Sequence, residues 1–565
     1  MDANIFNILD QYKKGSSKDY DILVSNLNNP SIESELLIHY LRGLKTCISV
    51  VGKEYEVLVG VLLKLDWLER EPAVVHEYQS FLVNLVSAHT VYLRATLRAL
   101  VKAFTPRPSS LSKNRAWKIV TDLVRKTDEE QFVKNHLVIK GISQIVPMMP
   151  TVLLPLLGDA FPYLSKAAYI QECYVKNLLQ ITHYMPDLRQ RILELIVDRM
   201  LKIDVRCPRT EIEQAECADL PEDMDIFDME KDDISTEMTH AKFGCEDMKH
   251  VDANKLDYMM ELMLRYIENT CYKDGVLDWE NTKLLYREIL LIFERLIFPT
   301  HASCHVQFIM FYLCSLRPEI CEGFLDFLWK KVTSPNVESI FRQGGVAYIA
   351  SLISRGQFVH VSTLKACLEL MSTWVHRYLL QANRLTRADV RHHGPFYSVC
   401  QAIFYVFAFR HKEILDSEKG YKWAKALNLQ TLVTSRLNPL RFSIPVITKT
   451  FSSVTRSYQL AYCDTIVEKN NRLMLPECSL EQGTLTTDHL NAFFPFDPYL
   501  LLRSQHFISQ IYREYEGNRP QEDVMESKDE DDFLPESTKS ECRTSVEMSQ
   551  FDFMNYGVSP GFKHV

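Results

Sequence analysis

The stretch of residues 188–204, LRQRILELIVDRMLKID, shows the pattern that decides the fold of this chain. Its apolar residues recur at positions i, i+3, i+4 and i+8, as Ile192, Leu195, Ile196 and Met200. This spacing places apolar side chains on one face of an α-helix, because a helix completes a turn every 3.6 residues. The stretch therefore predicts an amphipathic helix that must bury one face against a neighbour.

The same periodicity runs through most of the chain. It is found in residues 57–67, 78–88, 92–104, 255–266, 284–298, 323–332 and 364–380. Short breaks that contain proline separate these stretches, at 71–72, 105–108, 149–150, 185–186 and 334–335. Two helices and two turns then occupy about 40 residues, which is the period of HEAT-type repeats. We predict an all-α, HEAT-type helical-repeat superhelix, an α-solenoid, with an acidic loop and an acidic C-terminal tail.

The two acidic segments interrupt this pattern. Residues 211–233 carry eleven Asp and Glu side chains against the single basic Lys231, and the tail after Tyr515 includes the acidic run 526–532. Segments with so much like charge resist packing and remain solvated. We therefore expect four parts: N-terminal repeats at 1–204, a disordered acidic loop at 205–252, C-terminal repeats at 253–515, and a disordered acidic tail at 516–565.

Composition excludes several classes of protein. The net charge of −9 argues against a chain that wraps nucleic acid along its whole length. The 14 cysteines include no C-x-x-C pair, and residues 1–4 do not open a secretory signal, so we expect reduced thiols in the cytosol or nucleus. The longest nearly uncharged apolar run, 396–409, is shorter than the roughly 20 residues that span a bilayer, so we expect no membrane contact.

Catalytic signatures do not occur in the sequence. It has no phosphate-binding G-x-x-x-x-G-K-[ST] loop and no G-x-S-x-G nucleophile elbow, and Gly344-Gly345 is an isolated pair without dinucleotide-loop spacing. We therefore predict a binding protein that is not an enzyme and uses no cofactor.

One short string offers an alternative, a metalloenzyme. His301 and His305 stand four residues apart, and Phe298-Pro299-Thr300 ahead of them resembles a helix start with Thr300 as N-cap. On a helix both imidazoles would share one face, as in zinc proteases of the H-E-x-x-H type. The position of the general base is Ala302, however, and no third ligand lies nearby in the sequence. We predict no metal, and interpret the apolar run that follows as a core helix.

Serines in charged loops are candidate regulatory sites. Ser109, Ser110 and Ser112 lie among basic residues in a loop between two predicted helices, where phosphates can pair with local cations. In the acidic tail, Ser527 has Glu530 three residues on, a pattern that acid-directed kinases use. A phosphate adds roughly two negative charges. The alternative for these serines is an ordinary turn or a solubilising tail.

Several strings resemble the RNA polymerase I-specific transcription initiation factor family, also called transcription initiation factor IA. The N-terminal half contributes residues 85–88 and 172–175. The C-terminal half contributes residues 303–315, 393–398, 409–412, 437–440, 468–476 and 493–498. The resemblance covers roughly residues 10–535, and the length of the strings makes it specific.

The resemblance implies a HEAT-repeat protein of the nucleus and nucleolus without catalytic activity. It implies binding to RNA polymerase I, chiefly at the stalk and dock surfaces of the enzyme, delivery of the enzyme to the promoter-bound selectivity complex for ribosomal RNA synthesis, and control by regulatory kinases. The family has a serine patch facing the polymerase, which Ser109, Ser110 and Ser112 resemble in position. The loop at 105–115 is short and basic, where family members often carry an acidic one.

The sequence also offers DNA contact and an adaptor function as alternatives. Direct contact with DNA rests on two modest basic clusters, at 113–126 and 384–393, and each cluster by itself is better explained as a solvated helix face. A helical-repeat transport or scaffold adaptor, similar to the factor only in fold, is the alternative function.

Overall fold

The computed structural model of the chain describes residues 2–106, 122–217, 247–382, 388–415, 418–474, 490 and 494–515. Packing divides the chain into two compact units. Unit 1 comprises Met1–Leu296 and Leu501–Ser504, and unit 2 comprises Ile297–Leu500 and Gln505–Val565.

The described residues of unit 1 form helices and one small hairpin. In chain order it contains α1 (Asp2–Lys13), α2 (Lys18–Leu27), α3 (Ser34–Thr46), η1 (Ile48–Val50), η2 (Lys53–Tyr55), α4 (Glu56–Leu62), α5 (Pro72–Ala88), η3 (Thr90–Tyr92), α6 (Leu93–Lys102), α8 (Asp122–Ile145), α9 (Met149–Asp159), α10 (Ala168–Tyr184), η4 (Pro186–Leu188), α11 (Arg189–Asp204), α12 (Arg209–Cys217), α13 (Val251–Cys271), β1 (Tyr272–Lys273), β2 (Val276–Leu277) and α14 (Trp279–Ile292). The π-helical turn η5 (Phe293–Ile297) follows α14.

Apolar periodicity sets the inward face of each helix. In α11 the predicted residues Ile192, Ile196 and Met200 are fully buried, and Leu195 at the border of the stripe is half-buried. Proline sets helix boundaries, with Pro72 opening α5, because the missing N–H costs nothing in a first turn. The predicted breaks at 71–72, 149–150, 185–186 and 334–335 lie at ends of helices.

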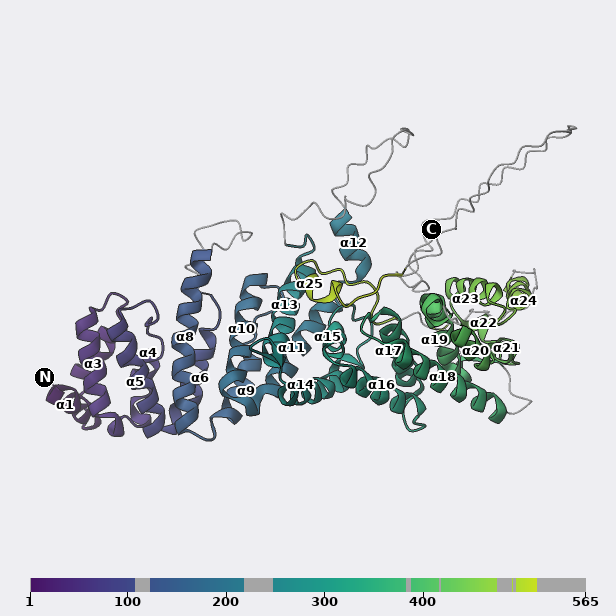
Figure 1. The fold of residues 1–565 in the computed structure, drawn as a ribbon. Coiled ribbons are helices and arrows are strands. Elements are labelled where there is room, and N and C mark those ends of the chain that lie inside the picture. The colour runs from purple at the N-terminus through teal and green to yellow at the C-terminus, as the bar shows by residue number, and fades with distance from the viewer. Residues whose placement is uncertain are drawn as a thin grey trace, which may run out of the picture. The chain divides into compact units, whose positions relative to one another are not determined.

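Neighbouring helices of unit 1 bury one another's stripes in sequence order. Helix α3 packs on α5, α5 on α8, and α8 on α10, and these helices lie side by side (Figure 1). Further along, α10, α11, α13 and α14 pack on one another in the same way. Contacts between helices close in sequence are the signature of a repeat array.

A tight hairpin follows α13. Strands β1 and β2 pair antiparallel, with Tyr272 opposite Leu277. The turn between them is Asp274-Gly275, and both residues have positive φ, 51° and 77°. This two-residue geometry favours Asp-Gly because its twist matches that of the strands. The hairpin redirects the chain from α13 into α14.

Unit 2 is also built of helices. It contains α15 (Phe308–Leu316), α16 (Pro318–Thr333), α17 (Ser339–Arg355), α18 (Val361–Gln381), α19 (Val390–Leu415), α20 (Glu418–Ala426), α21 (Leu429–Val433), α22 (Pro439–Phe442), α23 (Pro445–Ser457), α24 (Asp464–Met474) and α25 (Gln505–Ser509). Helix α17 packs on α16 and α19, and α19 packs on α18 and α23. The long apolar α19 is therefore the central helix of this unit.

A late segment of the chain completes the core of unit 2. The backbone N–H of Phe496, whose ring is fully buried, donates to Ser351 Oγ of α17 at 2.9 Å. The Arg355 guanidinium is buried against the rings of Phe409 and Tyr512, at 4.5 and 5.4 Å from their centroids. Residues 494–500 and 505–515 are thus part of the packed unit and not an appendage.

The prediction of an all-α helical-repeat fold is confirmed. The expected domain boundaries stay a prediction. Within the expected acidic loop, residues 209–217 form α12 and bury Ile212, while 218–246 lie outside the described residues, as does the expected tail from residue 516. Across the described part of the chain, no helix is both long and apolar enough to cross a bilayer.

The expected helix start at Thr300 is wrong. Helix α15 begins at Phe308, and Ala302 has a φ of 65°, which an α-helix does not allow. The buried Gln307 side chain holds the preceding turn: it accepts from Ser303 Oγ at 2.7 Å, and its Nε2 donates to the carbonyls of Ser303 and Pro495 at 2.9 and 2.7 Å. His301 and His305 therefore do not share a helix face, which removes the geometry of the zinc alternative.

Replacing Gln307 tests the importance of this turn. Gln307→Ala leaves two buried carbonyls without their donor, so we expect unit 2 to lose roughly 2–4 kcal/mol of unfolding free energy. Denaturant unfolding measures the loss. Gln381→Ala, at the exposed end of α18, is the matched control and should change stability by less than about 0.5 kcal/mol. Equal effects of the two substitutions would contradict the role of Gln307.

Candidate interaction site

The predicted serines lie outside the described residues. Ser109, Ser110 and Ser112 fall in the segment 107–121, and Ser527 falls in the tail. The described chain resumes at Asp122, the first residue of α8. The face of α8 is therefore the described surface that follows the serine loop directly in sequence, and the candidate site is built from it.

Helix α8 has two distinct faces. Its inward stripe is buried at Asp128, Phe132, Asn135 and Ile139, spaced three or four residues apart. The outward stripe includes Val133 and Leu137, whose exposed fractions are 59% and 58%. Two large apolar side chains four residues apart form one exposed patch, because residues i and i+4 are neighbours on a helix.

A groove of about 500 Å³ runs beside this patch, between α8 and α10. We call it the α8–α10 groove. It is lined by Glu129, Phe132, Val133, His136, Leu137 and Lys140 from α8 and by Lys176, Asn177, Gln180, His183 and Tyr184 from α10. Its lining combines apolar side chains with charged ones, as in the centre and rim of protein–protein interfaces.

A buried polar network forms the floor of the α8–α10 groove. His136 contacts Asn177 Oδ1 through Nε2 and the Tyr184 hydroxyl through Nδ1, both at 2.9 Å. The Asn177 amide donates to the carbonyls of Cys173 and Phe104, at 2.8 and 3.2 Å. Since both amide hydrogens are used, Asn177 Oδ1 must accept, so His136 carries its proton on Nε2 and accepts from Tyr184 at Nδ1.

Burial keeps the His136 ring neutral. Desolvation lowers the pKa of His136 to about 4, and the hydrogen bond with Asn177 opposes that shift only in part. The ring also stacks on Phe104, with centroids 5.1 Å apart. At neutral pH this imidazole is therefore a packed, hydrogen-bonded part of the groove floor, not a base.

Ion pairs between α8 and α10 border the groove. Arg125 donates to Glu172 at 2.7 Å and lies over the ring of Tyr169, 4.9 Å from its centroid. One helical turn away, Lys176 pairs with Glu129. Arg125 and Glu172 are largely shielded from solvent, whereas Lys176 and Glu129 are exposed and contribute little to stability. The pairs neutralise the acidic residues at this border.

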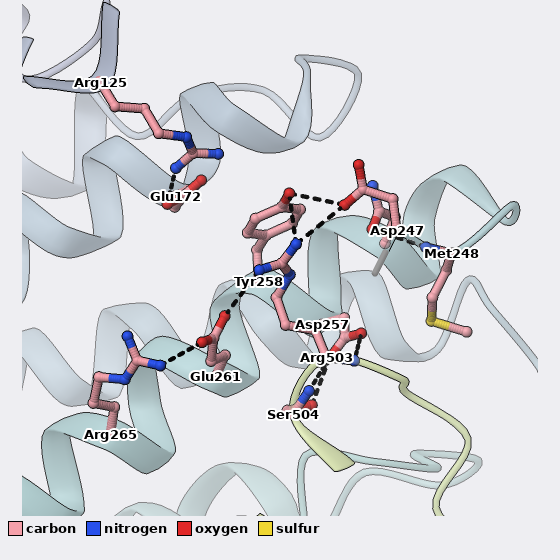
Figure 2. Close-up of polar contacts among 11 residues, drawn as sticks. Arg125, Glu172, Asp247, Met248, Asp257, Tyr258, Glu261, Arg265, Arg503 and Ser504 are labelled. Atoms are coloured by element: carbon pink, nitrogen blue, oxygen red, sulfur yellow. Dashed lines mark hydrogen bonds and ion pairs between the residues drawn. The ribbon is translucent and has the colours of Figure 1, made fainter. Parts of the chain in front are cut away.

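A second polar cluster, the α13 clamp, lies on α13, which packs on α10 in the same unit (Figure 2). Asp257 accepts hydrogen bonds from the backbone N–H groups of Arg503 and Ser504, at 2.7 and 2.8 Å, and from the Ser504 hydroxyl. The Arg503 guanidinium lies over the Tyr258 ring, 4.2 Å from its centroid, and 3.7 Å from Glu261. The clamp therefore fixes residues 501–504 on α13.

Burial shifts the pKa values of two groups in the clamp. Burial raises the pKa of Asp257, against the opposing effect of the hydrogen bonds from Ser504 and Arg503. Burial also raises the pKa of Tyr258 to about 12, and its hydrogen bond to Asp247 acts in the same direction. The shifted carboxylate of Asp257 is occupied by three hydrogen bonds from Arg503 and Ser504, so the clamp is a structural fastening beside the candidate site.

The described residues offer contact surfaces and no metal centre. No group of three or more His, Cys, Asp or Glu side chains in the described ranges is arranged to hold a metal ion. Sequence reasoning identified the loop that precedes α8 but missed the α8–α10 groove. One signal was available, since Val133 and Leu137 fall off the buried stripe of an otherwise amphipathic helix.

The fold and site together define a helical-repeat protein that presents a contact groove. A family model described as RNA polymerase I specific transcription initiation factor RRN3 matches residues 1–520. The chain belongs to this family, which is one of transcription initiation factors and not of enzymes.

Individual relatives agree with this assignment. The RNA polymerase I-specific transcription initiation factor RRN3 of Mus musculus is 38% identical, and the match covers 97% of this chain and 88% of the mouse protein. The factor rrn3 of Schizosaccharomyces pombe is 26% identical, over 94% of this chain and 89% of its own. A crystal structure of RNA Polymerase I Transcription Initiation Factor Rrn3 shares the fold, with a TM-score of 0.73, 20% identity, and coverage of 91% of this chain and 98% of that chain.

The buried His136 makes unit 1 sensitive to acid. In the unfolded chain a histidine binds its proton near pH 6.5, but folded His136 does so only near pH 4. Stability should therefore fall as the pH drops from 6.5 to 4, by up to about 3 kcal/mol from this residue. Urea unfolding of the wild type and of His136→Gln across this range measures the effect.

The glutamine variant should show a flatter pH dependence, because its amide does not titrate. His76→Gln on α5 is the matched control, since His76 is exposed, and should follow the wild-type slope. Parallel slopes for the wild type and His136→Gln would show that His136 does not carry this acid sensitivity.

Proposed function

We propose that the chain is an RNA polymerase I-specific transcription initiation factor that binds RNA polymerase I and bridges it to the promoter-bound selectivity complex on ribosomal RNA genes. The family match over residues 1–520 carries this proposal. The mouse relative has the same function in its name and aligns over 97% of this chain. Because ribosomal RNA genes are transcribed in the nucleolus, we propose that the protein acts in the nucleus and nucleolus.

The α8–α10 groove is the proposed polymerase-facing surface, with the stalk and dock of the enzyme as its partner surfaces. The groove follows the serine loop in sequence, and it presents Val133 and Leu137 for burial by a partner. Burying two such side chains stabilises a complex by a few kcal/mol. The paired charges at its border supply specificity more than affinity.

Phosphorylation of the loop serines is the proposed switch. A phosphate on Ser109, Ser110 or Ser112 would add about two negative charges ahead of α8. Against an acidic or apolar partner face this charge is repelled or left without a partner. Phosphorylation by regulatory kinases would therefore stop recruitment of RNA polymerase I. The tail serine Ser527 is a second proposed phosphorylation site.

The alternative function, a transport or scaffold adaptor, shares the helical-repeat fold but predicts different partners. Fold likeness alone does not separate the two functions, because one fold hosts many partners. The relatives that match over most of their length have initiation-factor names, which favours the first proposal. Capture of polymerase from a nuclear extract separates them directly.

Charged substitutions in the groove test the proposed surface. We expect Val133→Asp combined with Leu137→Asp to lower capture of RNA polymerase I from nuclear extract at least tenfold, because a buried unpaired carboxylate costs several kcal/mol. The free protein should keep its stability within about 0.5 kcal/mol, since both side chains are exposed.

Val57→Asp on α4 is the matched control. Val57 is 63% exposed and lies outside the groove, so this variant should capture polymerase like the wild type. Failure of the wild-type protein to retain any polymerase subunit at near-physiological salt, with or without phosphatase treatment, would contradict the proposed function. Unchanged capture by the double variant would contradict only the proposed surface.

Substitution of the loop serines tests the switch. We expect a triple variant to lower polymerase capture several-fold, because added negative charge opposes the contact. This variant changes Ser109, Ser110 and Ser112 together to Asp. Changing the same serines to Ala should preserve capture and make it insensitive to phosphatase treatment. Equal capture by the Asp and Ala variants would exclude this loop as a charge switch.

A further inference from the structure

A second groove, of about 550 Å³, lies in unit 2 and has a different character. We call it the basic groove. It is formed by α22, α23 and α24 and is lined by Leu440, Arg441, Ser443, Pro445, Thr448, Lys449, Ser452, Ser453, Arg456, Asp464, Val467, Asn470 and Asn471. The proposed polymerase contact does not use it.

Helix α23 supplies the wall of the basic groove through one face. Its lining residues include Pro445, Lys449, Ser453 and Arg456, which are three or four residues apart. This spacing stacks their side chains along one side of the helix. Two cations and a hydroxyl therefore project from a single rigid element toward the same space.

Two strings that resemble the initiation-factor family meet at this groove. Asn438 belongs to the string 437–440 and Asn470 to the string 468–476. Their side-chain amides bond reciprocally: Asn438 Nδ2 donates to Asn470 Oδ1 at 2.7 Å, and Asn470 Nδ2 donates to Asn438 Oδ1 at 3.2 Å. The pair ties α24 to the start of α22 and fixes the end of the groove.

The charges of the basic groove do not cancel. Arg456 pairs with Asp464 at 3.3 Å, and Asp464 also accepts from Ser452 Oγ at 2.7 Å. Arg441 and Lys449 have no acidic partner among the described residues. Three cations against one carboxylate leave an excess of two positive charges in the lining, which favours an anionic ligand.

A buried hydroxyl without a partner also lies in the lining. Thr448 is 4% exposed, and its Oγ1 makes no hydrogen bond to any described residue. Elsewhere on α23, Thr450 and Thr455 donate to the carbonyl four residues back, at 3.0 and 2.8 Å. Because an unsatisfied buried hydroxyl is costly, this donor, beside Lys449 in the groove, indicates a ligand that accepts hydrogen bonds.

We propose that the basic groove binds the phosphate of a phosphoserine or phosphothreonine in a peptide segment. Arg441 and Lys449 would pair with the phosphate oxygens, and Thr448 would donate a hydrogen bond to one of them. Leu440, Pro445 and Val467 give the flanking peptide an apolar wall.

Nucleic acid fits this groove less well. A protein that tracks a nucleic-acid backbone uses a row of cations, and single-strand binding adds aromatic platforms for the bases. Among the described residues, the lining of the basic groove has three cations, one of them paired with Asp464, and no aromatic side chain. A single phosphomonoester on a peptide matches the two cations without an acidic partner, Arg441 and Lys449, and the one hydroxyl donor of Thr448. This inference does not depend on polymerase binding.

Fluorescence polarisation with the full chain tests the proposal. The probe is a labelled peptide of residues 521–534, QEDVMESKDEDDFL, with phosphoserine at position 527, compared with the same peptide unphosphorylated. We expect the phosphopeptide to bind at least tenfold more tightly. Lys449→Gln and Arg441→Gln should each weaken it roughly three- to tenfold, as expected for charge-assisted hydrogen bonds at a partly solvated site.

Thr448→Val separates a ligand role from a structural one. The substitution keeps the shape of the side chain and removes an unpartnered hydroxyl, so thermal stability should be kept or raised while phosphopeptide affinity falls. Lys419→Gln, exposed on α20 and outside the groove, should leave affinity unchanged.

Three outcomes would overturn the proposal. The first is equal affinity for the two peptides. The second is that inorganic phosphate displaces the labelled phosphopeptide as effectively as the unlabelled phosphopeptide does, which would mean that the groove binds a free anion. The third is that the protein does not bind the phosphopeptide but binds a double-stranded DNA or single-stranded RNA oligonucleotide, and that the same variants lose this binding.

Discussion

Each helix of this protein has an apolar stripe that it can bury only against another helix, and this constraint determines where function can lie. In α11 the stripe of Ile192, Ile196 and Met200 is fully buried by its neighbours, and α5 and α8 likewise bury one face. Once a helix has met its neighbours, only its outward face and the loops at its ends remain available. An apolar residue on an outward face, such as Val133 or Leu137, is therefore exposed apolar surface that a partner can bury.

Burial of the apolar stripes determines which helices pack together. It changes little in energy when one helix slides slightly along another. Buried polar groups remove that freedom, because a displaced hydrogen bond leaves a donor or acceptor unsatisfied. His136, held between Asn177 and Tyr184, aligns α8 with α10 in this way. Asp257 does the same for residues 501–504 on α13, and burial raises its pKa in spite of the hydrogen bonds it accepts there.

The sequence predicted the elements that depend on local periodicity and missed those that depend on distant partners. The stripe in residues 188–204 identified α11, because 3.6-residue spacing is visible within one element. The start of α15 was mispredicted because Gln307 bonds to Pro495, 188 residues away, and stabilises a turn in place of a helical one. The bond between Ser504 and Asp257 joins positions 247 residues apart, and no local pattern indicates it. The predicted serines 109, 110 and 112 lie outside the described residues, so their role remains a proposal.

The two grooves differ in the physical basis of recognition. In the α8–α10 groove the acidic residues at the border are already paired, Glu172 with Arg125 and Glu129 with Lys176, so the gain on binding comes from burying apolar surface. In the basic groove Arg441 and Lys449 keep their charge available, so the gain comes from a paired anion and weakens as salt rises. If both proposals hold, a phosphate would have opposite consequences at the two grooves. It would add an unpaired charge beside the proposed polymerase surface, and it would supply the missing partner of Arg441 and Lys449 in the basic groove. A single type of modification would then oppose one contact of this protein and create another.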